Sequence, residues 1–90
     1  MTLREAVLWS LQSEDSYGLK LTRELEPLGL CKEGDQSVYP VLRGLEREGL
    51  ASHYEKGEAL EERGGRPRVY YKLTEKGQEA ADELRKRILP

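Results

Sequence analysis

An aromatic ring and two guanidinium groups recur at helical spacing between Gln36 and Leu50. At about 100° per residue, Tyr39, Arg43 and Arg47 lie on one flank of a helix. Such side chains can contact base edges and phosphates in a DNA major groove, where an arginine pairs bidentately with guanine. The alternative is a solvated helix whose arginines are balanced by neighbouring glutamates. The opposite flank is apolar and predicts contact with a core; it consists of Val38, Val41, Leu42 and Leu45.

A second group of cations surrounds a turn. Arg66 and Arg68 flank Pro67, and an arginine at this position can enter a minor groove or clamp its phosphates. The segment 63–76 holds five cations and one anion, a local charge of +4 in a chain whose net charge is −2. One face can therefore be positive although the molecule is not. An ordinary polar turn is the alternative, but it does not need this concentration of positive charge.

Four further residues are weaker candidates for contacts with DNA. Ser37 can cap the helix and also donate to a phosphate. Pro40 falls in the first helical turn, where its missing N–H costs little, and it shares the exposed flank. Lys72 and Lys76 add attraction for a phosphate backbone. The complete predicted DNA-binding set is Ser37, Tyr39, Pro40, Arg43, Arg47, Arg66, Arg68, Lys72 and Lys76.

The elements that must position these residues follow from periodicity and turn signals. A first helix is predicted over 3–11, and a second one begins near Tyr17 and ends at Pro27 and Gly29. The third is capped by Asp35 or Ser37 and closed by Gly49, with Leu50 folding back on it. Strands over 50–54 and 69–73 flank a polar tip over 55–65, and Thr74 caps a final helix. This order predicts a mainly α fold with a small β-hairpin, a winged helix-turn-helix. The chain is read as one domain, with the winged helix over 1–73 and a C-terminal helix over 74–90.

Apolar residues outside these faces suggest a second subunit. Leu8 and Trp9 do not fit the apolar stripe of the first helix, which indicates burial on more than one side. The final helix carries a stripe of Ala80, Ala81, Leu84 and Ile88. We expect this stripe to pack against Leu8 and Trp9 of a two-fold related subunit. Trp9 can also stack on a small aromatic effector at that interface, although packing alone is the more economical interpretation.

Composition excludes several classes of protein. The chain has 90 residues, of which 37% are hydrophobic and 36% charged, and no apolar run long enough for a membrane span. We expect a soluble, cytoplasmic protein that lacks a signal peptide. One cysteine, Cys31, excludes an internal disulfide, and with the one histidine, His53, it leaves too few ligands for structural zinc. We expect no cofactor or metal, and nothing in the sequence predicts an enzyme.

Several motifs together resemble the phenolic acid decarboxylase repressor (PadR) family of bacterial winged-helix regulators. The resemblance implies a homodimeric transcriptional regulator, usually a repressor. Its last helix would cross to the partner subunit, and the interface can hold a small aromatic effector. The matching pieces are Tyr17-Gly18, Val38-Tyr39-Pro40-Val41-Leu42, Leu45-Glu46-Arg47-Glu48-Gly49-Leu50, Gly65-Arg66-Pro67-Arg68 and Tyr70-Tyr71 followed by Leu73-Thr74-Glu75-Lys76-Gly77.

The leading hypothesis is therefore sequence-specific binding of double-stranded DNA by a homodimer on a palindromic site. Two copies of the third helix would enter successive major grooves about 34–36 Å apart. The alternative is a protein-interaction module that kept the winged-helix scaffold without binding DNA, because fold does not fix function. Salt-sensitive affinity for DNA separates the two.

Overall fold

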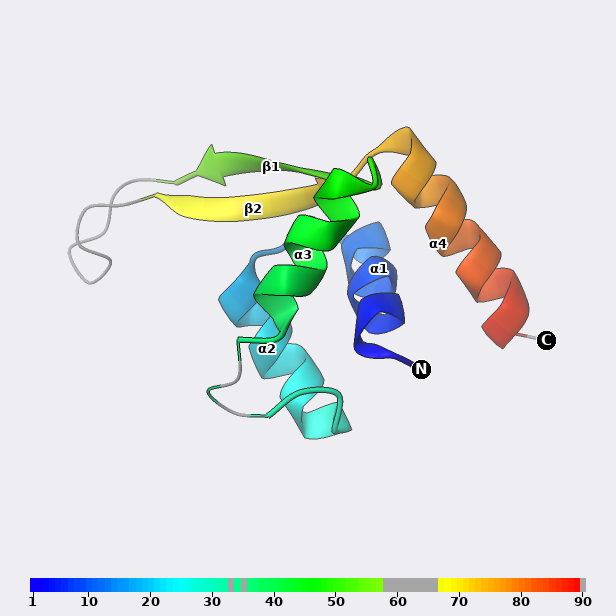
Figure 1. Ribbon diagram of the computed structural model, residues 1–90, viewed down its shortest axis with the longest axis horizontal. Helices are drawn as coiled ribbons and strands as arrows, with labels where there is room; N and C mark the ends of the chain where they lie inside the picture. Colours follow the sequence, from blue (N-terminus) through cyan, green and yellow to red (C-terminus); the bar gives the residue numbers. More distant parts are fainter. Residues whose placement is uncertain (33, 35, 58–66, 90) are drawn as a thin grey trace.

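The structure is a computed structural model that describes residues 1–32, 34, 36–57 and 67–89. Helices account for most of this part of the chain, and an antiparallel hairpin extends from one end of it (Figure 1). The prediction of a mainly α winged helix with a small hairpin is confirmed. The elements in chain order are α1 (Leu3–Ser13), α2 (Gly18–Leu25), η1 (Glu26–Leu28), α3 (Val38–Arg47), β1 (Ala51–Lys56), β2 (Arg68–Leu73) and α4 (Glu75–Ile88).

The ends of α3 agree only in part with the prediction. Gly49 adopts the left-handed conformation (φ 78°), and the Leu50 amide donates to the Leu45 carbonyl at 2.9 Å. This is a Schellman ending in which Leu50 is buried. Ser37 occupies the N-cap position, but its backbone is helical and its side chain makes no capping hydrogen bond. The expected cap from Ser37 is therefore wrong, and Asp35 lies outside the described residues.

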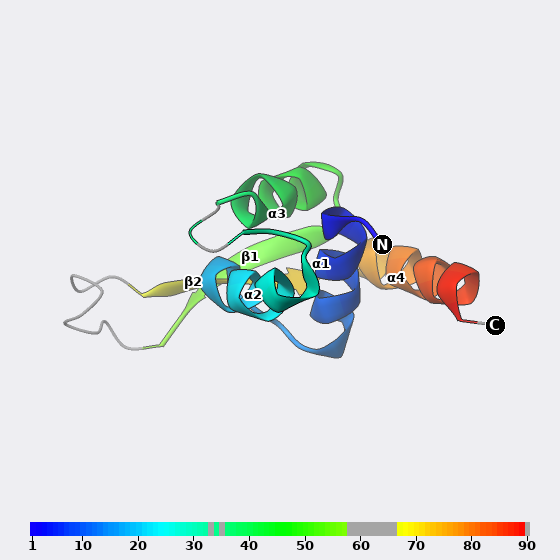
Figure 2. The same ribbon diagram turned by 90° about the horizontal axis from the view of Figure 1, so that it is seen from below.

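The hairpin pairs Ala51 with Leu73 at its base and Lys56 with Arg68 at its far end. Ser16, just before α2, forms an isolated antiparallel bridge with Tyr71 on the free edge of β2. The chain between α1 and α2 therefore lies beside the hairpin. Seen from below, α2 and α3 lie side by side next to the hairpin, and α4 lies at the opposite end of the molecule (Figure 2).

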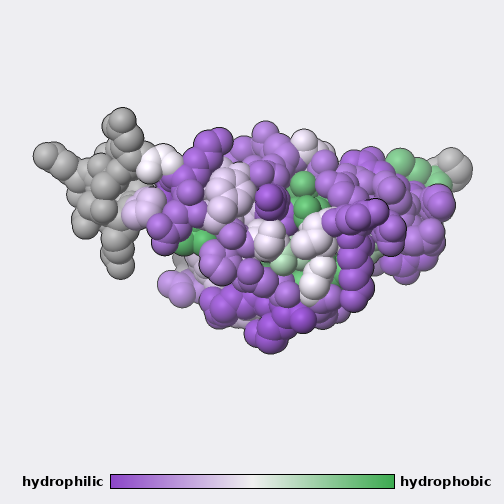
Figure 3. All heavy atoms as spheres, turned by 90° about the horizontal axis from the view of Figure 1, so that it is seen from above, coloured by the Kyte–Doolittle hydropathy of each residue, from purple (hydrophilic) through white to green (hydrophobic). Residues whose placement is uncertain are grey.

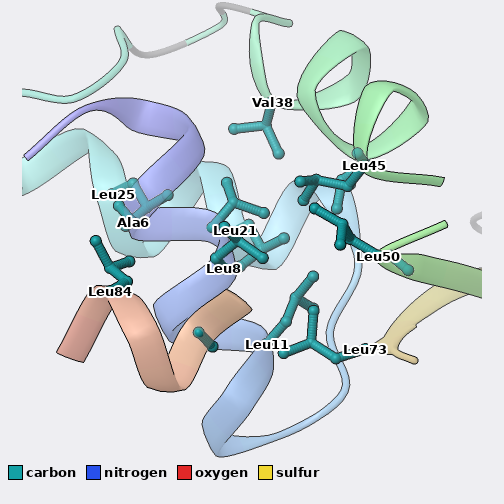
Figure 4. Close-up of a cluster of buried hydrophobic side chains, with 14 residues drawn as sticks. Ala6, Leu8, Leu11, Leu21, Leu25, Val38, Leu45, Leu50, Leu73 and Leu84 are labelled. Carbon is teal, nitrogen blue, oxygen red and sulfur yellow. The ribbon is translucent and has the colours of Figure 1, made fainter. Parts of the chain in front are cut away.

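The core forms where α1 meets the other helices and the base of the hairpin (Figure 4). Leu8 and Leu11 of α1 are buried, as are Ala81 and Leu84 of α4. The prediction reserved Leu8, Ala81 and Leu84 for a second subunit, and the structure corrects it, because α4 folds back on α1 of its own chain. These three side chains keep almost no free area. Leu28, at the end of η1, stays outside this core and is 69% exposed.

The corner between β2 and α4 is attached to the end of α3. Thr74 caps α4 as predicted, accepting from the Gly77 amide at 3.1 Å. Its hydroxyl also donates to the Gly49 carbonyl at 2.6 Å, and its amide donates to the Leu50 carbonyl at 3.0 Å. The Lys76 ammonium donates to the Glu48 carbonyl at 3.1 Å. The start of α4 and the end of α3 are therefore one hydrogen-bonded unit.

The surface seen from above is mostly hydrophilic, with hydrophobic atoms confined to small separate areas, one of them at the C-terminal end of α4 (Figure 3). Ile88 and Leu89 are 41% and 51% exposed there. In the part of the chain that the structure describes, no helix has the length and apolar character needed to cross a membrane.

Candidate nucleic-acid interface

Helix α3 separates its two flanks as the periodicity predicts. Val38, Leu42 and Leu45 are fully buried, whereas Arg43 and Arg47 are exposed. This division places the guanidinium groups on the side of α3 that faces away from the core. A shallow hollow of about 350 Å³ lies along the first turns of this flank, lined by Gln36, Tyr39, Pro40 and Arg43.

Tyr39 extends from α3 towards the start of α2. Its ring lies directly over Gly18, so that a Cβ atom on Gly18 would stand 2.6 Å from Cζ and 2.8 Å from Cδ1 of the tyrosine. Only glycine leaves room for the ring at this position. Tyr39 is 36% exposed and lines a second hollow of about 170 Å³, with Tyr17, Gly18, Leu19, Arg68 and Val69. Tyr39 therefore belongs to both hollows.

Arg68, at the far end of β2, reaches the second hollow. Its guanidinium carbon lies 4.4 Å from the centre of the Tyr17 ring, a cation–π contact. Among the described residues Arg68 forms no ion pair, so no carboxylate in that part of the chain neutralises its charge. A positive group therefore stands beside Tyr39, although the two residues are 29 positions apart in the sequence.

The two predicted lysines, Lys72 and Lys76, each contact another part of the chain. Lys72 pairs with Ser52 across the hairpin, and its ammonium lies 5.9 Å from the centre of the Tyr54 ring. Tyr54 and Lys72 share the face of the hairpin that is turned away from α3, because the alternate residues face that helix. Lys76 is bound to the end of α3. Lys72 therefore does not share one continuous surface with α3, whereas Lys76 lies against the C-terminal end of that helix. Ser37 is half-buried, and Arg66 lies outside the described residues.

The other face of the hairpin is attached to α3. His53 Nδ1 lies 2.7 Å from a carboxylate oxygen of Glu46. Tyr71, paired with His53, packs below the same part of the helix. Burial raises the pKa of the Tyr71 phenol, the Glu46 carboxylate raises it further, and the Arg43 guanidinium opposes the change. The tyrosine stays neutral at physiological pH, and the hairpin is fixed beside α3.

Trp9 lies on the surface formed by α1 and α4. The guanidinium carbon of Arg85 stands 4.3 Å from the centre of the indole ring, and Arg85 also donates to Gln12. One face of Trp9 is therefore covered within its own chain. Ala80 is half-buried and Ile88 exposed, so Trp9, Ala80 and Ile88 are the residues of the predicted subunit interface that keep free area.

Sequence reasoning did not assign Tyr17, Gly18 and Gln36 to this surface. Gln36 precedes the helix, so the helical periodicity of the residues that follow does not predict its position. Tyr17 and Gly18 were placed at the start of α2, but a glycine that accommodates a distant ring has no local signature. Only the adjacent pair Tyr17-Gly18, among the motifs of the family resemblance, pointed to this position.

Comparison with known proteins agrees with the arrangement of α2, α3 and the hairpin. Residues 7–83 match the model of the family described as "Transcriptional regulator PadR-like family". The chain belongs to the PadR-like family. The family resemblance found in the sequence is therefore confirmed, and the protein is a transcriptional regulator of this type rather than a member of an enzyme family.

Solved structures that include PadR-like regulators share the fold. A PadR-like transcriptional regulator from Bacillus cereus is 29% identical, with a TM-score of 0.74 over 94% of this chain and 79% of that one. A PadR family regulator from Eggerthella lenta is also 29% identical, with a TM-score of 0.74 over 96% and 70%. The protein smu.1704 from Streptococcus mutans is 29% identical, with a TM-score of 0.77 over 96% and 74%. No curated protein matches the sequence.

Proposed function

We propose that this PadR-like protein binds double-stranded DNA sequence-specifically as a homodimer on a palindromic operator and represses transcription from it. The observation that carries the proposal is the position of Arg43 and Tyr39. They stand on the flank of α3 opposite the buried Val38, Leu42 and Leu45, and share a hollow open to solvent. A helix presented in this way by a helix-turn-helix is the element that enters a major groove.

The roles within the interface follow from the geometry. Arg43 is the proposed base-reading residue, because it lies mid-helix on the exposed flank and a guanidinium pairs bidentately with guanine. Arg47, one turn further along α3, is the proposed phosphate contact. Arg68 of the hairpin is the second proposed backbone contact, beside Tyr39. The two copies of α3 would stand about 34–36 Å apart on the operator.

The dimer is proposed through the face formed by α1 and α4. Trp9, Ala80 and Ile88 keep free apolar area there, and a chain this small buries a limited fraction of its own surface. The small aromatic effector that the family resemblance implies would bind at this face, against the part of Trp9 that remains exposed. We also propose a cytoplasmic location, because a regulator must reach its promoter.

Replacement of Arg43 tests the proposal. A duplex is first selected from a random-sequence library with the native chain, and its dissociation constant is measured by mobility shift. Arg43→Ala is expected to weaken binding by about 1–3 kcal/mol, roughly 5- to 150-fold, and to relax base preference at one position of each half-site. Lys86→Ala is the control, because it also removes one positive charge but lies on α4, away from the hairpin.

The outcomes separate the two functions considered from the sequence. Equal loss in the two variants, or no loss in either, would contradict base reading by Arg43. Failure of the native chain to select any duplex, together with capture of a single protein partner, would favour the protein-interaction module instead.

The contact between Gly18 and Tyr39 gives a second prediction. In Gly18→Ala the new methyl group must displace the Tyr39 ring, and we expect operator affinity to fall several-fold. Stability should change by no more than about 1 kcal/mol, because alanine is the better helix former and the ring can turn outwards. In a Tyr39→Ala background, Gly18→Ala should have little further effect on affinity. Equal losses in both backgrounds would show that Gly18 acts through something other than Tyr39.

A further inference from the structure

Four consecutive residues, 15–18, which run from the connection after α1 to the first residue of α2, each contact the hairpin or α3. The Tyr54 hydroxyl of β1 donates to the Asp15 carboxylate at 2.6 Å, and this hydrogen bond raises the pKa of Tyr54 to about 12. Ser16 and Tyr71 exchange two backbone hydrogen bonds, of 3.1 and 2.7 Å. The segment therefore acts as a short third strand beside β2. We call residues 15–18 the joint segment.

Tyr17 is the residue of the joint segment with the most aromatic contacts. Its ring meets the Tyr70 ring edge to face, with centroids 5.1 Å apart and an interplanar angle of 66°. Tyr70 in turn stacks on Tyr54 at 5.7 Å. The Arg68 guanidinium carbon lies 4.4 Å from the centre of the Tyr17 ring. Tyr17 therefore contacts two residues of β2, Tyr70 and Arg68.

Gly18, the next residue, carries the ring of Tyr39. Gly18 thus contacts Tyr39 of α3, and the adjacent Tyr17 contacts Arg68 of the hairpin. The side chains of Tyr39 and Arg68 line the hollow of about 170 Å³ between the two elements. Tyr17 and Gly18 therefore lie between Tyr39 of α3, the proposed recognition helix, and Arg68 of the hairpin, which is the wing.

We propose that Tyr17 is a positioning residue, which holds Arg68 of the wing at a fixed distance from Tyr39 of the recognition helix so that both meet one DNA duplex. This inference rests on the proposed function, because it assigns Tyr17 a part in the same interface.

The physical basis is the cost of ordering an arginine. A free arginine side chain loses much rotamer freedom when it binds a phosphate, and that loss weakens binding. A guanidinium already stacked on a fixed ring has lost part of that freedom before DNA arrives, and it keeps its full charge. Without the ring, Arg68 still attracts phosphate but is no longer pre-ordered.

The test is a double-mutant cycle between Tyr17→Leu and Arg68→Ala, measured on the duplex that the native chain selects. We expect Tyr17→Leu to weaken binding about 2- to 25-fold, the range of a cation–π contact. In the Arg68→Ala background the same replacement should have no further effect. Tyr17→Phe, which keeps the ring, should bind like the native chain, and thermal unfolding of each variant is recorded alongside.

Three results would overturn the inference: native affinity in Tyr17→Leu, an undiminished loss of affinity in the Arg68→Ala background, or failure of Tyr17→Phe to restore binding. If Tyr17→Leu does not fold, Arg68→Lys takes its place, because it keeps the charge without the flat guanidinium. Reduced affinity in Arg68→Lys supports the inference and native affinity refutes it. Failure of the native chain to bind any duplex would instead refute the proposed function itself.

Discussion

Raising the salt concentration from about 50 to about 200 mM is expected to weaken operator binding by a factor of about 10³–10⁵. The estimate assumes that each subunit of the dimer neutralises about four phosphates, and each neutralised phosphate releases condensed counterions. The measurement is the dissociation constant at several salt concentrations, plotted as logarithms. The chain has a net charge of −2, so this dependence would come from the local cations of α3 and the wing rather than from the molecule as a whole.

The slope of that plot also tests single residues. Arg47→Ala, which removes a proposed phosphate contact, should lower the slope by about one unit per subunit and weaken all sequences alike. Lys86→Ala on α4 should leave the slope unchanged. An affinity that does not vary with salt in the native chain would exclude an interface built on phosphate contacts.

Gly77→Ala is expected to destabilise the fold by about 3 kcal/mol, at the upper end of the usual cost of overpacking. A Cβ atom on Gly77 would overlap the Leu50 carbonyl oxygen and stand 2.9 Å from its carbonyl carbon. These are backbone atoms that cannot turn aside, and the same carbonyl accepts the Thr74 amide. The methyl group must therefore push α4 away from the end of α3.

Thermal unfolding followed by circular dichroism measures this effect. For a domain of this size about 3 kcal/mol corresponds to a fall in Tm of roughly 12–24 °C. Gly44→Ala is the matched control, because its Cβ would meet only the Arg47 side chain at an ordinary 3.7 Å. The control should be neutral or slightly stabilising, since alanine favours helix over glycine. A Gly77→Ala chain as stable as the control would show that α4 can shift away from the end of α3 without loss of stability.

Local patterns predicted α3 well because the helical period and its stop signals lie within one short segment. Neighbouring residues alone show that Arg43 and Leu42 lie on different flanks of the helix. They also show that Gly49 and Leu50 end it. The same reasoning placed Thr74 at the start of α4 correctly. The order of helices and strands was then sufficient to predict the winged helix from the sequence.

Periodicity shows that a face is buried but not what buries it, and this explains the main correction. The stripe that includes Ala81 and Leu84 was assigned to a second subunit, whereas α1 of the same chain covers it. The two-residue period of a strand likewise divides side chains between two faces without saying which face α3 occupies. For that reason Lys72 was grouped with Arg43, although it lies on the far side of the hairpin.

The junction of Thr74, Lys76 and Gly77 with the end of α3 has a geometric consequence for a dimer joined through α4. Because three hydrogen bonds join the start of α4 to the end of α3, we expect the angle between the two α4 helices of the proposed dimer to fix the separation of its two α3 helices. A compound that altered that angle would change how many base pairs the proposed dimer spans, without touching a residue that is proposed to contact DNA.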